Sequence, residues 1–200
     1  MRDTLAAADL LERIRALEHE VAEALDEKQR RFGYELIEGR ARFSLEVQRR
    51  HARLRTALIP YVLHSRLLVV LTAPFIYACF VPFLLLDLFI STYQAICFPV
   101  YGVPKVRRRD YIVFDRGKLK YLNLLERLNC AYCSYANGLS AYVTEIAART
   151  EQHWCPIKHA ERLHAPHSRY AKFFDYGDGE QYARRLEALR SDYRDLTDGE

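Results

Sequence analysis

The sequence lacks the short motifs that mark the commonest catalytic and nucleotide-binding sites. It contains no GxGxxG pattern, no phosphate-binding P-loop, no HExxH and no GxSxG. Glycine, which such loops need, occurs only eight times in 200 residues. The sequence therefore gives no indication of nucleotide binding through these loops or of hydrolysis by these sites.

An apolar stretch is also missing from the N-terminus. Residues 1–28 carry eight acidic and four basic side chains, whereas a secretory signal peptide needs an uncharged core of about 7–15 residues. We therefore expect the protein to face the reducing cytoplasm. In that setting its five cysteines are expected to bind metals or do redox work rather than form structural disulfides.

Charge is almost absent from a central stretch, Leu67 to Pro104, where Asp87 is the only charged residue among 38. A helix that spans a membrane needs about 20 apolar residues, and 38 is too few for two full spans and a loop. Three prolines interrupt the stretch. The sequence predicts a membrane-embedded hairpin within residues 57–104, with its turn near Pro82 to Asp87. One long, kinked span and a hairpin buried in a soluble core are the alternatives.

Basic residues lie on both sides of this stretch. Residues 29–56 and residues 102–130 each carry eight basic and three acidic side chains. Because basic flanks stay on the cytoplasmic side of a membrane, we expect a membrane protein with both termini facing the cytoplasm. Juxtamembrane arginines commonly contact anionic lipid headgroups, so membrane lipid is the expected partner and nucleic acid is not.

The rest of the chain is predicted to be mainly α. Residues 1–56 are expected to form N-terminal helices over 3–31 and 34–56. The first repeats apolar residues with a 4-3-4-3 spacing that is compatible with a coiled coil, and so with a homo-oligomer or a protein partner. Its apolar positions are Leu10, Ile14, Leu17, Val21 and Ala24. The second has Leu36, Phe43, Val47 and Leu54 as apolar positions among many arginines.

Residues 105–200 are predicted to form a small cytoplasmic domain rich in cysteine and histidine. We expect a β-hairpin over residues 110–122, because apolar and polar residues alternate around a glycine; a helix beginning near Lys118 is the alternative. Helices are expected over 139–150 and 180–195. Tyr135 and Tyr142 should share a packed face, and Glu145 and Arg149 should form an i,i+4 pair.

The pattern Cys130-x2-Cys133-x21-Cys155-x3-His159 carries the candidate chemistry. Three thiolates and one imidazole form a common tetrahedral zinc set, and the spacing is similar to that of zinc-ribbon proteins. His164 and His167 are possible further ligands. Because a helix separates the two pairs, loops at 134–138 and 151–154 must bring the chain back, and Asn137-Gly138 is a suitable turn.

Two functions from different classes follow. The first is a membrane-anchored metal-binding protein, with structural zinc, that acts as an interaction or assembly module. The second is a membrane-bound redox protein, in which the same ligands hold a [2Fe–2S] cluster or Cys130 and Cys133 form a reactive dithiol. Whether the protein is an enzyme is left open.

Overall fold

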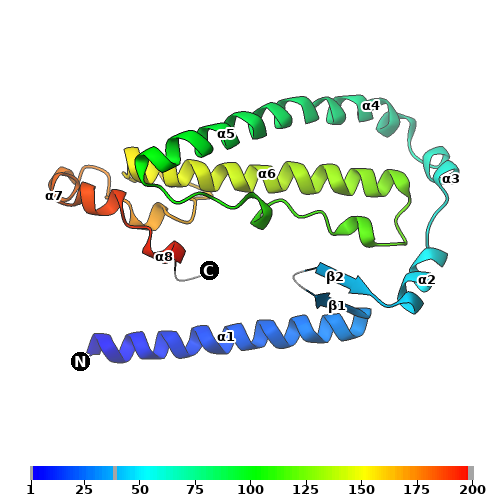
Figure 1. Cartoon of the computed structure of the whole chain (residues 1–200), viewed down its shortest axis with the longest axis horizontal. Coiled ribbons are helices and arrows are strands. Elements are labelled where there is room, and N and C mark those ends of the chain that lie inside the picture. Colours follow the sequence, from blue (N-terminus) through cyan, green and yellow to red (C-terminus); the bar gives the residue numbers. More distant parts are fainter. Residues whose placement is uncertain (1, 38–39, 198–200) are drawn as a thin grey trace. The chain divides into compact units, whose positions relative to one another are not determined.

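The computed structural model describes residues 2–37 and 40–197, apart from the side chains of residues 2–12, 15 and 197. The described chain is mainly helical, as predicted (Figure 1). It divides into two compact units. One contains residues 1–58 and 115–125, and the other contains residues 59–114 and 126–200. Each unit is described by itself.

The first unit begins with the long helix α1 (Arg2–Phe32), which confirms the helix predicted over residues 3–31. Gly33 follows it with a φ of +66°, a left-handed conformation that glycine adopts without strain and that ends the helix. The strands β1 (Tyr34–Ile37) and β2 (Arg40–Phe43) then pair antiparallel. Helix α2 (Leu45–Arg53) completes the segment, and the Ser44 hydroxyl accepts a hydrogen bond from the amide of Val47.

The single helix predicted over residues 34–56 is therefore wrong in its first half. Leu36 and Phe43 were taken as positions on a helix face, but Leu36 pairs with Ala41 across the two strands and Phe43 pairs with Tyr34. Polar and apolar residues alternate in Arg40–Phe43, a pattern that fits a strand of period two.

The second unit contains the apolar stretch. Helices α3 (Leu58–Leu63), α4 (Leu67–Ala78) and α5 (Phe80–Tyr101) follow one another, and only Cys79 separates α4 from α5. Leu67–Tyr101, 35 residues in all, is the one described helical stretch that is long and apolar enough to cross a membrane.

The predicted hairpin turn near Pro82 to Asp87 is wrong, because the chain is helical throughout those residues. Pro82 is the third residue of α5. Amides in the first turn of a helix have no acceptor within it, so a proline is tolerated there. In place of a hairpin, the structure shows one helical stretch from Leu67 to Tyr101, interrupted at Cys79.

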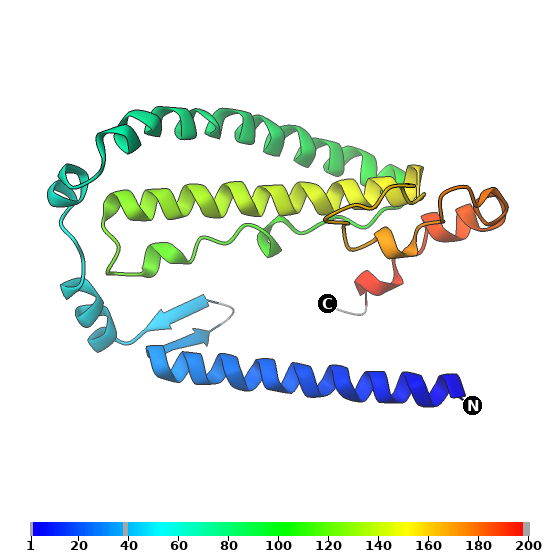
Figure 2. The ribbon, with the colours of Figure 1, turned by 180° about the vertical axis from the view of Figure 1, so that it is seen from behind.

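After α5 the chain turns back. Residues 103–114 run beside α5 and α6 (Leu124–Trp154), and α6 then runs in the same direction as α5 (Figures 1 and 2). The order of contacts agrees, because Tyr132 bonds to Ile76, Tyr135 to Asp87 and Tyr142 to Gln94. The β-hairpin predicted over residues 110–122 is wrong: those residues form no strand. They begin at the last residue of the 3-10 turn η1 (Arg108–Asp110) and include a second one, η2 (Arg116–Lys118).

Helix α6 is continuous over 31 residues, so the loops predicted at 134–138 and 151–154 are wrong. Gly138 does not make a turn. It lies where α6 meets the returning chain, and a Cβ atom there would stand 2.6 Å from the carbonyl oxygen of Tyr111 and 3.0 Å from the Cα of Ile112. Glycine is required for close packing rather than for a bend.

The core lies between α5, the returning segment and α6. Its fully buried side chains include Phe98, Leu139, Tyr142 and Ile146, and Tyr135 is nearly so, which confirms that Tyr135 and Tyr142 share a packed face. The C-terminal part packs on the end of α6 through η3 (Tyr170–Lys172), α7 (Gly179–Arg190) and α8 (Arg194–Thr197). The Asp178 carboxylate caps α7, close to the start predicted for the last helix.

Candidate functional site: a two-faced apolar helix

The predicted metal ligands are distributed along α6 and beyond its end. Cys130 and Cys133 lie in its first third, and Cys155 follows its last residue. At about 1.5 Å per residue, the 22 positions from Cys133 to Cys155 correspond to about 33 Å. Among the residues that the structure describes, no group of three or more His, Cys, Asp or Glu side chains could hold a metal ion. The structure does not bring these sulfurs together, and zinc and the [2Fe–2S] cluster stay predictions without geometric support.

The candidate histidines lie on the C-terminal side of Cys155. The rings of His159 and His167 lie 6.3 Å and 5.8 Å from the ring of Tyr170, and His167 Nε2 is 2.9 Å from a carboxylate oxygen of Glu151. His164 is exposed. These contacts attach residues 155–172 to the end of α6, which is a structural role.

The polar side chains of the apolar helix form a different constellation, centred on Asp87. Its carboxylate accepts hydrogen bonds from the Arg108 guanidinium at 2.6 and 3.3 Å, from the Tyr135 hydroxyl at 2.9 Å and from the Ser91 hydroxyl at 3.1 Å. Asp87, which was expected at the hairpin turn, instead links α5 to the returning segment and to α6.

The electrostatics of this contact favour the ion pair. The hydrogen bond from Arg108 to Asp87 raises the pKa of the guanidinium. Burial first, and the hydrogen bond to Asp87 second, raise the pKa of Tyr135 to about 12. The Tyr135 hydroxyl therefore stays protonated at neutral pH and remains a donor.

A second polar contact lies two turns further along α5. The Gln94 side chain accepts from the Val106 amide at 2.6 Å, donates to the Val106 carbonyl at 3.3 Å and donates to the Tyr142 hydroxyl at 2.8 Å. Nearby, the hydroxyls of Tyr93 and Thr150 lie 3.1 Å apart. These bonds satisfy the buried amide of Gln94, and all of them face the protein.

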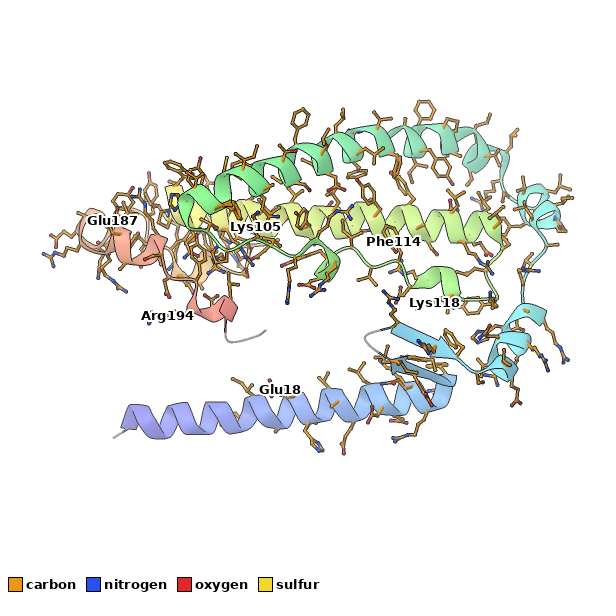
Figure 3. All side chains as sticks on the ribbon, in the orientation of Figure 1. Glu18, Lys105, Phe114, Lys118, Glu187 and Arg194 are labelled. Carbon is orange, nitrogen blue, oxygen red and sulfur yellow. The ribbon has the colours of Figure 1, made fainter. Side chains whose placement is uncertain are left out.

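The opposite face of α4–α5 is apolar. Side chains project from it on the side away from α6 (Figure 3). The two outward threonines, Thr72 and Thr92, donate to carbonyls of their own helix, those of Val69 and Leu88, as hydroxyls in apolar surroundings do. The large exposed side chains on this stretch include Leu68, Leu71, Phe75, Val81, Leu85, Leu88, Phe89, Ile96 and Val100. We call this surface the outward face.

An apolar cavity of about 330 Å³ lies between the helices, and Tyr77, Phe80, Phe114 and Tyr132 are among its lining residues. The hydroxyls of two of these tyrosines are already engaged, Tyr77 with the Asn129 side chain and Tyr132 with the Ile76 carbonyl. Ring surfaces rather than reactive groups therefore face the cavity. Such a lining suits the binding of an apolar ligand better than the catalysis of a reaction.

Charged side chains gather at the C-terminal end of α6. Glu145 and Arg149 form the predicted i,i+4 pair at 2.8 Å. Arg169, which is almost fully buried, bonds to the Gln152 side chain and pairs with Asp195 at 3.1 Å. Burial alone would raise the pKa of Asp195, but Lys172 and Arg169 together lower it. Every partner here is on the chain itself, so the cluster stabilises the fold.

Sequence reasoning missed the inward polar stripe, although a signal was present. Asp87, Ser91 and Gln94 are four and three residues apart, so they share one face of a helix. No family model matches this sequence, and no curated protein or solved structure is similar to it. The two faces of α4–α5 therefore carry the functional conclusion.

Proposed function

We propose that the protein is a membrane-associated interaction or assembly module, attached to a lipid bilayer by the outward face of α4–α5. One observation carries the proposal. The side chains of Asp87, Gln94 and Tyr93 bond to the protein, whereas the other side of the same helix exposes large apolar side chains. A helix that pairs its polar groups inward and leaves its apolar groups outward fits an apolar solvent.

The size of the outward face supports lipid as its neighbour. Single apolar residues on a surface need no explanation, but soluble proteins rarely expose apolar patches beyond a few hundred Å². Here exposed apolar side chains recur from Leu67 to Val100, and none of the most apolar part of the stretch is buried. Insertion into a bilayer removes this surface from water.

Helix α1 is the proposed surface for partners. Ile14, Leu17, Val21 and Leu25 are all exposed on an otherwise charged helix, and their spacing of 3, 4 and 4 places them on one side. A second copy or a helical partner that buries this row fits an assembly role. Amides in the first turn of a helix stabilise a thiolate. Cys130 lies beyond the first turn of α6, so the redox alternative gains no support.

Vesicle flotation tests the attachment. We compare the wild type with the double variant Leu85→Lys/Phe89→Lys on the outward face, and with Val113→Lys as a control at an exposed site of the returning segment, which is not part of the outward face. Each lost apolar contact costs about 1.5–3 kcal/mol, so the double variant should bind roughly 100-fold or more weakly. The control should bind as the wild type does.

Circular dichroism of all three proteins keeps the result interpretable, because the substituted side chains are exposed and the helices should be unchanged. Equal flotation of the double variant and the wild type would contradict the proposal. For the partner surface, Leu17→Lys/Val21→Lys should abolish chemical cross-linking between chains and leave flotation unchanged.

A further inference from the structure

We propose that α4–α5 lies in the plane of the membrane, within one leaflet, and does not cross the bilayer; the partner is an anionic phospholipid surface. The inference rests on the proposed membrane attachment and adds its geometry. It follows from what lies against the inward side of the helix at each point along it.

Charged residues lie against the middle of the stretch. Asp87 is 20 residues from Leu67 and 14 from Tyr101, and Arg108 is bonded to it. Arg107 and Arg109 flank this contact with side chains that are 47% and 79% exposed. If the helix crossed a bilayer at its centre, these guanidinium groups would lie in hydrocarbon, where charge is strongly disfavoured.

Shifting the crossing to the first half of the stretch meets the same obstacle. Tyr77, near the middle of that half, bonds to the Asn129 side chain. Glu126 and Arg127 lie within one turn of Asn129 on α6, so a crossing there would bring another pair of charges into the membrane core.

The returning chain adds a backbone argument. Residues 103–107 have no regular secondary structure, yet they run beside α5, where Val106 bonds to Gln94. Irregular backbone does not occur against lipid in a bilayer core. It is compatible with the water-facing side of a helix that lies in the interface.

Length and flanking charge agree with this placement. At about 1.5 Å per residue the stretch is about 52 Å long, well beyond the roughly 30 Å of a bilayer core. Arg66 precedes it and Lys105 follows it. In a single crossing these basic residues would lie on opposite sides, whereas an in-plane helix keeps both on the cytoplasmic side. Lys105, labelled in Figure 3, lies just beyond the end of α5.

Interfacial side chains occur at the C-terminal end of the helix. Trp154, the only tryptophan, is exposed and lies with its ring edge against Tyr101 at 5.3 Å. Tryptophan and tyrosine gather at the level of lipid headgroups. Arg107 and Arg109 are exposed beside Asp87, and their positive charge fits negatively charged headgroups.

Depth-dependent fluorescence quenching tests the geometry with the full chain. In a Trp154→Phe background, single tryptophans replace Phe75, Phe89 and Val100, which are all exposed on the outward face. Each protein is bound to phosphatidylcholine–phosphatidylglycerol vesicles whose acyl chains carry bromine near the headgroup or near the bilayer centre. We expect all three tryptophans to be quenched more by the shallow bromines, with the same ratio.

The other outcomes each overturn the proposal in a distinguishable way. Deep quenching at position 75 or 89 combined with shallow quenching at position 100 would mean that the helix crosses the bilayer, and membrane attachment would stand. Absence of quenching at all three positions would refute both the geometry and the attachment. A dimeric mass without lipid in that case would assign the outward face to a second copy of the chain.

Discussion

Helices α1 and α6 have the same length, 31 residues each, but only α6 is held by packing. Eight residues of α6 are buried, whereas none of the described side chains of α1 is. Both contain apolar residues spaced by 3 and 4: Ile14, Leu17 and Val21 in α1, and the buried trio Leu139, Tyr142 and Ile146 in α6. Periodicity predicts the helix and its apolar side; whether the same chain covers that side depends on the rest of the fold.

Truncating one leucine in each helix gives the largest expected contrast. Leu139 is fully buried, and Leu139→Ala should destabilise the fold by about 2–5 kcal/mol through lost burial and a cavity. Leu17 is exposed, and Leu17→Ala should change stability by less than about 0.5 kcal/mol. Urea unfolding followed by circular dichroism in detergent measures both. Equal losses would show that α1 is packed in the folded protein.

A methyl group added at two glycines gives the next contrast. Gly138→Ala places a Cβ against backbone atoms of Tyr111 and Ile112, so it should cost about 1–3 kcal/mol by overpacking, although alanine is otherwise favoured in a helix. Gly117→Ala meets no atom within 4 Å and should stay within about 0.5 kcal/mol of the wild type. Thermal unfolding compares the two. A stabilised Gly138→Ala protein would contradict the close approach of α6 to the returning chain.

The pH dependence of stability should report the C-terminal end of α6. Burial first, and Arg190 second, lower the pKa of His153, whose ring stacks on Tyr101 at 5.1 Å. The unfolded chain binds a proton at this residue near pH 6.5 and the folded chain does so only at lower pH. The stability from His153 is therefore complete above about pH 6.5 and is lost as pH falls through the folded pKa.

The matched variants for this test are His153→Phe, which keeps an aromatic ring, and His164→Gln, which changes an exposed histidine. Unfolding midpoints are measured between pH 7.5 and pH 5 (a range chosen around the ordinary pKa of histidine, about 6.5). His153→Phe should flatten the slope and His164→Gln should not. The same slope in all three proteins would place the pH sensitivity elsewhere.

The smallest expected effect is that of Cys133→Ser on metal content. Because α6 holds Cys133 about 33 Å from Cys155 at 1.5 Å per residue, we expect the substitution to leave the zinc content of purified protein unchanged. Elemental analysis measures it. About one zinc per wild-type chain, lost in Cys133→Ser, would restore the four-ligand prediction and require α6 to break between the two cysteines.

Local signals in the sequence predicted the parts of the fold that local physics determines. Helix α1, the helical centre of α6, the Glu145–Arg149 pair and the start of α7 all depend on residues within one or two turns of each other. The arrangement of α5, the returning segment and α6 depends on contacts such as Asp87–Tyr135, 48 residues apart. No spacing rule contains that information.

The metal-site prediction gains no geometric support for a related reason. Cys130, Cys133, Cys155 and His159 form a persuasive pattern only if the chain between them turns back, and Asn137-Gly138 offered a turn. In the structure the small size of Gly138 serves packing against Tyr111, which a single sequence does not distinguish from turn formation. Pro82 misled in the same way, because a proline in the first turn of a helix does not break it. Pro74 and Pro99 lie inside α4 and α5, and neither ends its helix.

The parallel course of α5 and α6 has a consequence for the order of folding during synthesis. A helical hairpin can close as soon as its second arm is made, but here the chain must run back along α5 before α6 begins. Gln94 meets Tyr142 only when 48 more residues have been added, and Tyr93 meets Thr150 only after 57. Non-local contacts of this kind form slowly. The inward side of α5 thus meets Val106 and Arg108 after 12 and 21 residues but waits much longer for α6. The proposed attachment gives its outward face a bilayer to join during that interval.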